Sequence, residues 1–192
     1  MSELAGRMTF STLFLMMFMA ALPAGAQQKL VSGPESSRLA FIARYEDQEL
    51  AGRFQRFTAE LVQDSETGFP VTLGVDVDTG SADMNDRDIN DELKQPAWFD
   101  SFSFPAARFE STTIRRLDAQ RFIAEGHLTL KGSRQPVEVP FSWFEGAEGY
   151  SMSGELILSR LAWGIGSGEW ADESTIADDV RLSFEVTLVT DN

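Results

Sequence analysis

A repeated alternation of apolar and polar residues, with a period of two, constrains the fold more than any other feature of the sequence. In residues 71–78 the apolar Val71, Leu73, Val75 and Val77 alternate with Thr72, Gly74, Asp76 and Asp78. Successive side chains of a β-strand point to opposite faces of its sheet, so this pattern predicts a strand with one buried face. Related patterns occur in residues 39–43, 52–62, 122–130, 137–143, 152–158 and 182–188.

The segments between these predicted strands favour antiparallel pairing. Residues 131–136, KGSRQP, and residues 145–150, EGAEGY, are short and rich in turn-forming residues, as expected for hairpin connections. No long helical pattern alternates with the strands, which disfavours a parallel sheet. Repeated strands with one apolar face each need a closed barrel or a sandwich. The sequence therefore predicts one antiparallel, all-β domain.

One short helix is predicted within this domain, at about residues 87–93. Asp86 or Asp88 is suited to cap its first turn, and Pro96 marks its end. A connector with an unusual number of aromatic residues follows the helix. Its aromatic residues are Trp98, Phe99, Phe102, Phe104 and Phe109.

The first residues predict export. Residues 10–22 are apolar and uncharged, Arg7 precedes them, and Ala24 and Ala26 form an A-x-A cleavage pattern. This arrangement is typical of a secretory signal peptide, residues 1–26, and the run is too short to span a bilayer as a permanent helix. Either Met1 or Met8 is the true start. Residues 27–192 then form the mature domain, which we expect in the periplasm without stable membrane insertion.

Composition excludes several classes of function. The chain has no cysteine and a net charge of -14, which exclude a disulfide scaffold, a thiolate site and a nucleic-acid surface rich in Lys and Arg. The single histidine, His127, lies between the apolar positions Gly126 and Leu128 and is expected to face outward. The acidic stretch at residues 76–92 has a cation, Arg87, in a ligand position of a calcium loop. No metal site or catalytic constellation is predicted.

Four motifs, in order and at matching spacing, resemble one family. They are residues 87–99, RDINDELKQPAWF; residues 104–111, FPAARFES; residues 126–137, GHLTLKGSRQPV; and residues 159–166, SRLAWGIG. Together they are similar to the YceI-like, polyisoprenoid-binding proteins of bacterial envelopes, and the resemblance extends from about Ser37 to Val189. It implies a lipocalin-like antiparallel β-barrel of about eight strands with a short inserted helix. It also implies a long isoprenoid lipid or quinone in the apolar interior, no catalytic residue and no cofactor.

An eight-stranded barrel has an interior that side chains can just fill or that can hold one ligand. We expect Trp98, Phe99 and Phe102 to close one end of it, although the same rings could simply fill the core. The remaining predicted contacts to the ligand are inward positions of the strands and one loop residue. They are Phe41, Val75, Ala124, Gly126, Leu128, Leu130, Phe141, Gly154, Leu156, Trp163 and Phe184.

Three small residues among these positions, Ala124, Gly126 and Gly154, suggest space for a lipid tail, since glycine in a strand often marks a close approach by a ligand. The alternative is that both glycines relieve curvature or lie at bulges.

Two functions remain open from the sequence. The first is non-catalytic binding of an isoprenoid lipid or quinone in the periplasm, as a carrier or store. The alternative is an envelope interaction module with a filled barrel, which acts through a surface partner such as a membrane redox protein. A homodimer is suggested by family analogy alone.

Overall fold

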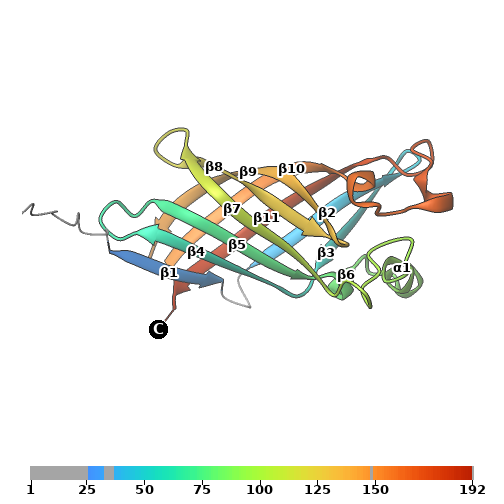
Figure 1. Ribbon diagram of the computed structural model, residues 1–192, viewed down its shortest axis with the longest axis horizontal. Helices are drawn as coiled ribbons and strands as arrows, with labels where there is room; N and C mark the ends of the chain where they lie inside the picture. Colours follow the sequence, from blue (N-terminus) through green and yellow to red (C-terminus); the bar gives the residue numbers. More distant parts are fainter. Residues whose placement is uncertain (1–25, 33–36, 148, 192) are drawn as a thin grey trace, which may run out of the picture.

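The computed structural model describes residues 26–32, 37–147 and 149–191. The predicted signal peptide lies outside these residues except for Ala26, so it stays a prediction. The described chain forms one elongated β-barrel with a helix at one end (Figure 1).

All strands belong to a single antiparallel sheet. Most of them are long, and each runs antiparallel to its neighbours, as the hairpin-like connections predicted. The strands are β1 (Gln27–Ser32), β2 (Arg38–Tyr45), β3 (Gln48–Phe54), β4 (Phe57–Asp64), β5 (Pro70–Asp78), β6 (Ala82–Asp83), β7 (Ala106–Arg116), β8 (Arg121–Leu130), β9 (Ser133–Gly146), β10 (Gly149–Ser159) and β11 (Asp179–Thr190).

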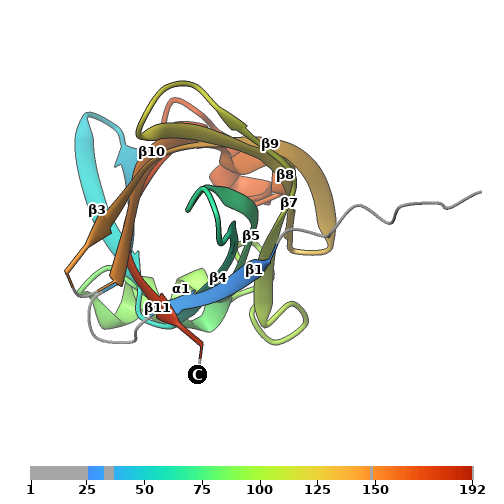
Figure 2. The ribbon, with the colours of Figure 1, turned by 90° about the vertical axis from the view of Figure 1, so that its left-hand side faces the viewer.

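The sheet closes on itself through β11. One end of β11 pairs with β1, with Val31 opposite Val189, and its other part pairs with β2, with Phe41 opposite Leu182. β1 and β2 therefore follow one another along β11 and share one position in the wall. β4 pairs with β1 and β3 pairs with β2, so β4 and β3 share the next position. Counted in this way, the described residues form the predicted lipocalin-like barrel of eight strands. Figure 2 shows the ring of strands from the end opposite the helix.

Turn chemistry explains the connection between β8 and β9. Lys131 and Gly132 both have positive φ, at 49° and 74°, and Leu130 pairs directly with Ser133. A two-residue turn with two positive φ angles matches the right-handed twist of the strands it joins. The predicted hairpin is therefore confirmed, with a shorter turn than the sequence suggested.

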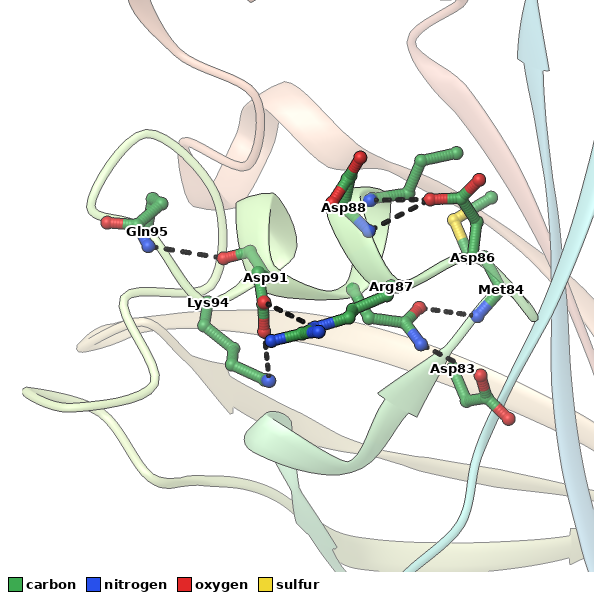
Figure 3. Close-up of polar contacts among 10 residues, drawn as sticks. Asp83, Met84, Asp86, Arg87, Asp88, Asp91, Lys94 and Gln95 are labelled. Atoms are coloured by element: carbon green, nitrogen blue, oxygen red, sulfur yellow. Dashed lines mark hydrogen bonds and ion pairs between the residues drawn. The ribbon is translucent and has the colours of Figure 1, made fainter.

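Helix α1 (Arg87–Leu93) has the predicted bounds. The Asp86 side chain caps it by accepting hydrogen bonds from the backbone N–H groups of Asp88, at 2.9 Å, and Ile89, at 3.1 Å (Figure 3). Such a cap satisfies N–H groups that have no partner within the helix. Three short 3-10 helices complete the irregular parts: η1 (Thr79–Ser81), η2 (Arg160–Trp163) and η3 (Gly168–Ala171).

The buried side chains fall into two clusters that divide the barrel along its length. We call the larger cluster the packed half. Its buried members are Leu30, Leu39, Ala59, Leu61, Leu73, Phe109, Phe122, Ala124, Val139, Phe141, Trp143, Met152, Phe184, Val186 and Leu188. The smaller cluster lies at the α1 end and contains Phe41, Ala82, Leu93, Phe99, Trp163 and Ile165.

The small residues predicted to leave room for a tail lie in the packed half and leave no room there. A Cβ atom at Gly126 would lie 2.2 Å from the carbonyl oxygen of Glu110, next to a register shift in β7. A Cβ at Gly154 would lie 2.3 Å from the carbonyl oxygen of Pro140 and 2.6 Å from the Phe184 ring. Ala124 is fully buried. These contacts favour the alternative, in which the glycines allow a close approach of protein atoms.

We predict that Gly154→Ala destabilises the protein by about 1–3 kcal/mol, because the added methyl group has no space beside Pro140 and Phe184. Gly74→Ala is the matched control, since a Cβ at this strand position meets nothing within 4 Å. The control should keep or slightly raise the stability. Urea unfolding of both variants measures the difference, and equal stabilities would contradict the assigned contacts.

Candidate functional site

A cavity of about 430 Å³ occupies the half of the barrel nearest α1. Inward side chains of β2, β3, β5, β7, β8, β10 and β11 form its wall, together with α1 and the loops that follow α1 and β10. Because side chains alternate along a strand, it is mainly the apolar faces of these strands that reach the interior. The volume is within the range of about 300–1,000 Å³ that is common for small-molecule pockets.

The cavity ends where the packed half begins. Five of its lining residues also belong to the packed half or contact it, and we call them the floor. They are Leu39, Phe54, Val77, Leu128 and Leu182.

Aromatic rings form much of the wall above the floor. The Phe54 ring lies 5.4 Å from that of Phe41 and 5.8 Å from that of Phe99, centroid to centroid. Trp163 is buried, and its indole N–H faces the carbonyl oxygen of Leu128 at 3.4 Å. Large rings that contact one another hold the wall in a fixed shape, which suits a preformed apolar site.

The cavity reaches the surface between α1 and the hairpin of β2 and β3, and we call this opening the mouth. β3 pairs with β2 along one side, and on its other side it pairs with β6 only at Arg53 and Phe54. Residues 48–52 of β3 therefore have a neighbouring strand on one side only. The mouth is lined by Arg44, Tyr45, Leu50, Asp88, Ile89 and Glu92, and it carries most of the polar groups of the cavity.

Arg160 holds the irregular segment that covers the cavity, residues 160–178. Its guanidinium group donates hydrogen bonds of 2.7–3.0 Å to the backbone carbonyls of Ile165, Gly166, Trp170, Ile176 and Ala177. The side chain is only 4% exposed, and burial lowers its pKa while Asp178 and Glu173 oppose that change. One buried side chain therefore satisfies carbonyls that no regular strand or helix would satisfy.

Lys131 connects this covering segment to the aromatic connector. Its ammonium group donates to the carbonyl oxygens of Pro96, at 2.7 Å, and Gly164, at 2.8 Å. Burial lowers the pKa of Lys131, and the charge of Asp100 works against that change. The connector and the covering segment are thus held together over the same end of the barrel.

α1 is fixed beside the mouth by the carboxylate of Asp83, on β6. This group accepts hydrogen bonds from the Asn90 side chain, at 2.9 Å, and from the Gln55 side chain, at 2.8 Å (Figure 3 shows the first). These bonds, with one from the backbone of Asn85 and the charge of Arg53, lower the pKa of Asp83. The amide oxygen of Asn90 also accepts from the Met84 backbone.

The structure brings together six of the predicted ligand contacts and separates the others from them. Six line the cavity: Phe41, Trp98, Phe99, Leu128, Leu130 and Trp163. Seven lie in or against the packed half, or at close contacts within it: Val75, Ala124, Gly126, Phe141, Gly154, Leu156 and Phe184.

Phe102 corrects the sequence prediction, because its side chain is 98% exposed rather than directed inward. The connector around it turns tightly, with Asp100 at a φ of 47° and hydrogen bonds from Ser103 and Phe104 back to its carbonyl. Trp98 and Phe99 fall on the inner side of this turn and Phe102 on the outer side.

Several residues of the cavity were missed by the sequence analysis. Val180 follows the alternation of β11 and could have been found by extending that pattern by one step. Ile165, Trp170 and Ile176 come from the irregular covering segment, where no periodicity shows which side chains face inward. Ala43 and Ala107 line the cavity as small residues of regular strands.

Metal-ligating side chains do not gather into a site in the described residues. Among them, no group of three or more His, Asp or Glu side chains is arranged to hold a metal ion, and none of the cavity-lining residues is a histidine. His127 lies on β8 opposite Glu110 and Pro136 and does not line the cavity. Within the part of the chain that the structure describes, no helix has the length and apolar character needed to cross a bilayer.

The fold and cavity define a closed, lipocalin-like β-barrel with an apolar pocket at one end. Residues 31–188 match the YceI-like domain, and the chain belongs to that family.

The chain is also similar to individual proteins of known sequence or structure. The UPF0312 protein plu2095 of Photorhabdus laumondii is 24% identical over 71% of this chain and 72% of its own length. The crystal structure of Burkholderia cenocepacia BcnA is 27% identical, with a TM-score of 0.77 over 83% of this chain and 99% of that one. A polyisoprenoid binding domain from Saccharophagus degradans has the same fold, with 11% identity and a TM-score of 0.68 over 86% of this chain and all of that domain.

We predict that Arg160→Lys destabilises the protein by about 2–5 kcal/mol, because an ammonium group cannot reach five carbonyls and leaves several of them buried without a donor. Arg181→Lys is the control, since this arginine is 47% exposed and pairs with Glu155 on the outer face. The control should change stability by no more than about 0.5 kcal/mol. Thermal unfolding measures both, and a mild effect of Arg160→Lys would contradict the role given to this side chain.

Proposed function

We propose that this protein is a non-catalytic periplasmic binding protein that holds an isoprenoid lipid or quinone in its barrel, as a carrier or store. The observation that carries the proposal is the cavity at the α1 end, which is formed almost entirely by apolar side chains and opens to the surface at one polar mouth. An apolar tail would enter the cavity, and the polar head would remain at the mouth.

The physical driving force for such binding is the removal of the tail from water. Burial of apolar surface contributes about 0.8 kcal/mol for each CH₂ group. The cavity offers few polar groups, so the tail would be selected by its size and shape. The charged and hydroxyl groups of Arg44, Tyr45 and Glu92 at the mouth would contact the head.

Two observations outside the cavity support the proposal. The Saccharophagus degradans domain with the same fold is a polyisoprenoid binding domain. The N-terminal sequence has the pattern of a cleaved signal peptide, which would deliver the mature domain to the periplasm.

A non-catalytic role agrees with the polar groups near the cavity. All five guanidinium N–H groups expected of an arginine are used by Arg160 in bonds to backbone carbonyls. Thr79 donates its hydroxyl to the carbonyl of Phe104 at 2.8 Å. These groups serve the structure of the wall.

The alternative function, an envelope interaction module, is favoured by two different observations. Half of the barrel is packed with side chains, and Phe102 presents an exposed ring beside the α1 end. In that case a surface partner, such as a membrane redox protein, would recognise the connector and the cavity would stay empty. Crosslinking in the periplasm that recovers no reproducible partner would count against this alternative.

The first test is native mass spectrometry of the protein purified from the periplasmic fraction of a bacterial culture. We expect a chain that begins at Gln27 and carries an apolar adduct that organic solvent removes. A chain that is found only with residues 1–26 attached would contradict the predicted localisation. Protein that is always free of adduct and takes up neither ubiquinone nor a polyprenol would contradict lipid binding.

The second test separates the cavity from the packed half by the same substitution in each. Ala107 lines the cavity, so Ala107→Phe should occupy ligand space and lower quinone affinity at least about tenfold without loss of thermal stability. Ala124 is 0% exposed in the packed half, so Ala124→Phe should cost about 1–3 kcal/mol of stability and leave affinity nearly unchanged. The measurements are quinone quenching of tryptophan fluorescence and thermal unfolding. If Ala124→Phe lowered quinone affinity and Ala107→Phe did not, the ligand would lie in the packed half and the proposed site would be wrong.

A further inference from the structure

The barrel changes from hollow to packed at the same level on neighbouring strands. On β11, Val180 and Leu182 line the cavity, whereas Phe184 belongs to the packed half. On β8, Leu128 lines the cavity, and Ala124 is buried in the packed half. The change is therefore a boundary across the barrel rather than a local narrowing.

Two phenylalanine residues of the packed half lie directly beside floor residues on the neighbouring strands. Phe184 on β11 is opposite the floor residue Leu39, and Phe109 on β7 is opposite the floor residue Leu128. Their residues are 8% and 6% exposed, respectively. Both belong to the packed half, and Ala107 and Leu182, two positions away on the same strands, line the cavity. The two rings therefore form the side of the packed half that borders the cavity.

The glycines at this level leave no passage around the rings. The Phe184 ring lies against Gly154, at 2.6 Å from the position of an added Cβ. At Gly126 the backbone of Glu110 and Ser111 occupies the corresponding position, at 2.2 Å and 2.7 Å. The glycines thus accommodate a ring and a neighbouring strand, and close packing there excludes a tail.

The far end of the barrel is also closed by rings. Phe122 stacks on Phe141 at 5.6 Å, and Trp143 stacks on Tyr150 at 5.1 Å. The Arg116 guanidinium lies 4.1 Å from the centre of the Phe69 ring, and the Trp143 indole donates to the carbonyl of Gly68 at 3.1 Å. Among the described residues, the way into the cavity is therefore the mouth beside α1.

The volume sets the length of tail that this single chamber can hold. If each methylene-sized group takes about the ~30 Å³ that a water molecule takes in the liquid, a cavity of about 430 Å³ holds roughly fourteen such groups. With five carbons in each isoprene unit, that is about three units.

We infer that the barrel of this protein takes up only about three isoprene units of a tail, because Phe109 and Phe184 close the barrel below the cavity. The inference rests on the proposed function and makes it specific for the ligand. A longer tail would have to leave its remaining units in water at the mouth, where they gain nothing from the protein.

The test is a series of quinones that share one head group and carry one, two, three, four and nine isoprene units. Binding to the delipidated full mature chain is followed by quenching of tryptophan fluorescence, since three of the four tryptophans, Trp98, Trp163 and Trp170, line the cavity. We expect affinity to rise at least about tenfold for each unit up to three, from the apolar area that each unit buries, and then to stay constant.

The possible results separate this inference from the proposed function. Affinity that continues to rise to nine units would overturn the length limit and leave lipid binding in place. No binding at any length would overturn the proposed function and this inference with it. Affinity that rises up to about three units and then stays constant supports both.

A pair of variants tests the assigned boundary. Phe184→Ala should join the cavity to new space below the floor and move the limit beyond three units. Phe122→Ala is the matched control: Phe122 is 2% exposed in the packed half, stacked on Phe141. It should lose comparable stability and keep the limit at three.

An unchanged limit in a folded Phe184→Ala protein would overturn the role of this ring. If the alanine variant does not fold, Phe184→Leu, which removes less of the side chain, gives the same comparison. The quinone series with the wild-type protein tests the length limit without any variant.

Discussion

The rest of the structure depends on the closure of one sheet through β11. Each strand has one apolar face, and a sheet with free edges would leave some of those faces and two rows of backbone groups in water. The pairing of β11 with β1 at one end and β2 at the other closes the sheet with a single strand and leaves residues 48–52 of β3 as a short unpaired edge. All inward faces then meet around one axis, and the interior becomes either a core or a chamber according to the side chains at each level.

Side-chain size, rather than polarity, decides which of the two forms. Both halves are lined by apolar residues of the same strands, so the alternation alone would predict one uniform interior. In the packed half, large rings lie opposite small residues, as Phe184 does opposite Gly154, and the space is used up. At the α1 end the rings lie in the wall, as with Phe41 and Phe99, and the centre stays open.

The sequence predicted those parts of the structure that follow from local chemistry. Helix α1 has its expected bounds because the Asp86 cap and the polar first turn determine where it starts. The inward faces of β8 and β11 follow from alternation, and the resemblance to the YceI-like family led to the barrel. Alternation predicts which face of a strand is buried, but it does not predict which other side chains a residue meets at its height along the barrel axis. For this reason Leu128 and Ala124 had the same prediction and lie in different halves.

The residues that were misplaced or missed have a common physical cause. Phe102 follows a tight turn at Asp100, and the apolar residues of the covering segment owe their direction to the long-range bonds of Arg160. Such bonds join residues that are not neighbours in the sequence, so no periodic pattern reveals them. Gly126 and Gly154 carry a real signal of close approach, but a glycine does not reveal whether a ligand, a ring or a backbone approaches it.

The division of the barrel also explains how a chain without disulfides can keep an open chamber. A fully enclosed cavity of about 430 Å³ would cost about 10 kcal/mol at the cost per Å³ found for core deletions, which equals the whole stability of many domains. The mouth reduces that cost because it opens the chamber to solvent. The packed half supplies the apolar burial that holds the sheet closed, while Arg160, Lys131 and Asp83 hold the irregular segments around the chamber by polar bonds. Filling the chamber would restore the missing contacts, so the same feature that weakens the empty barrel favours an apolar ligand.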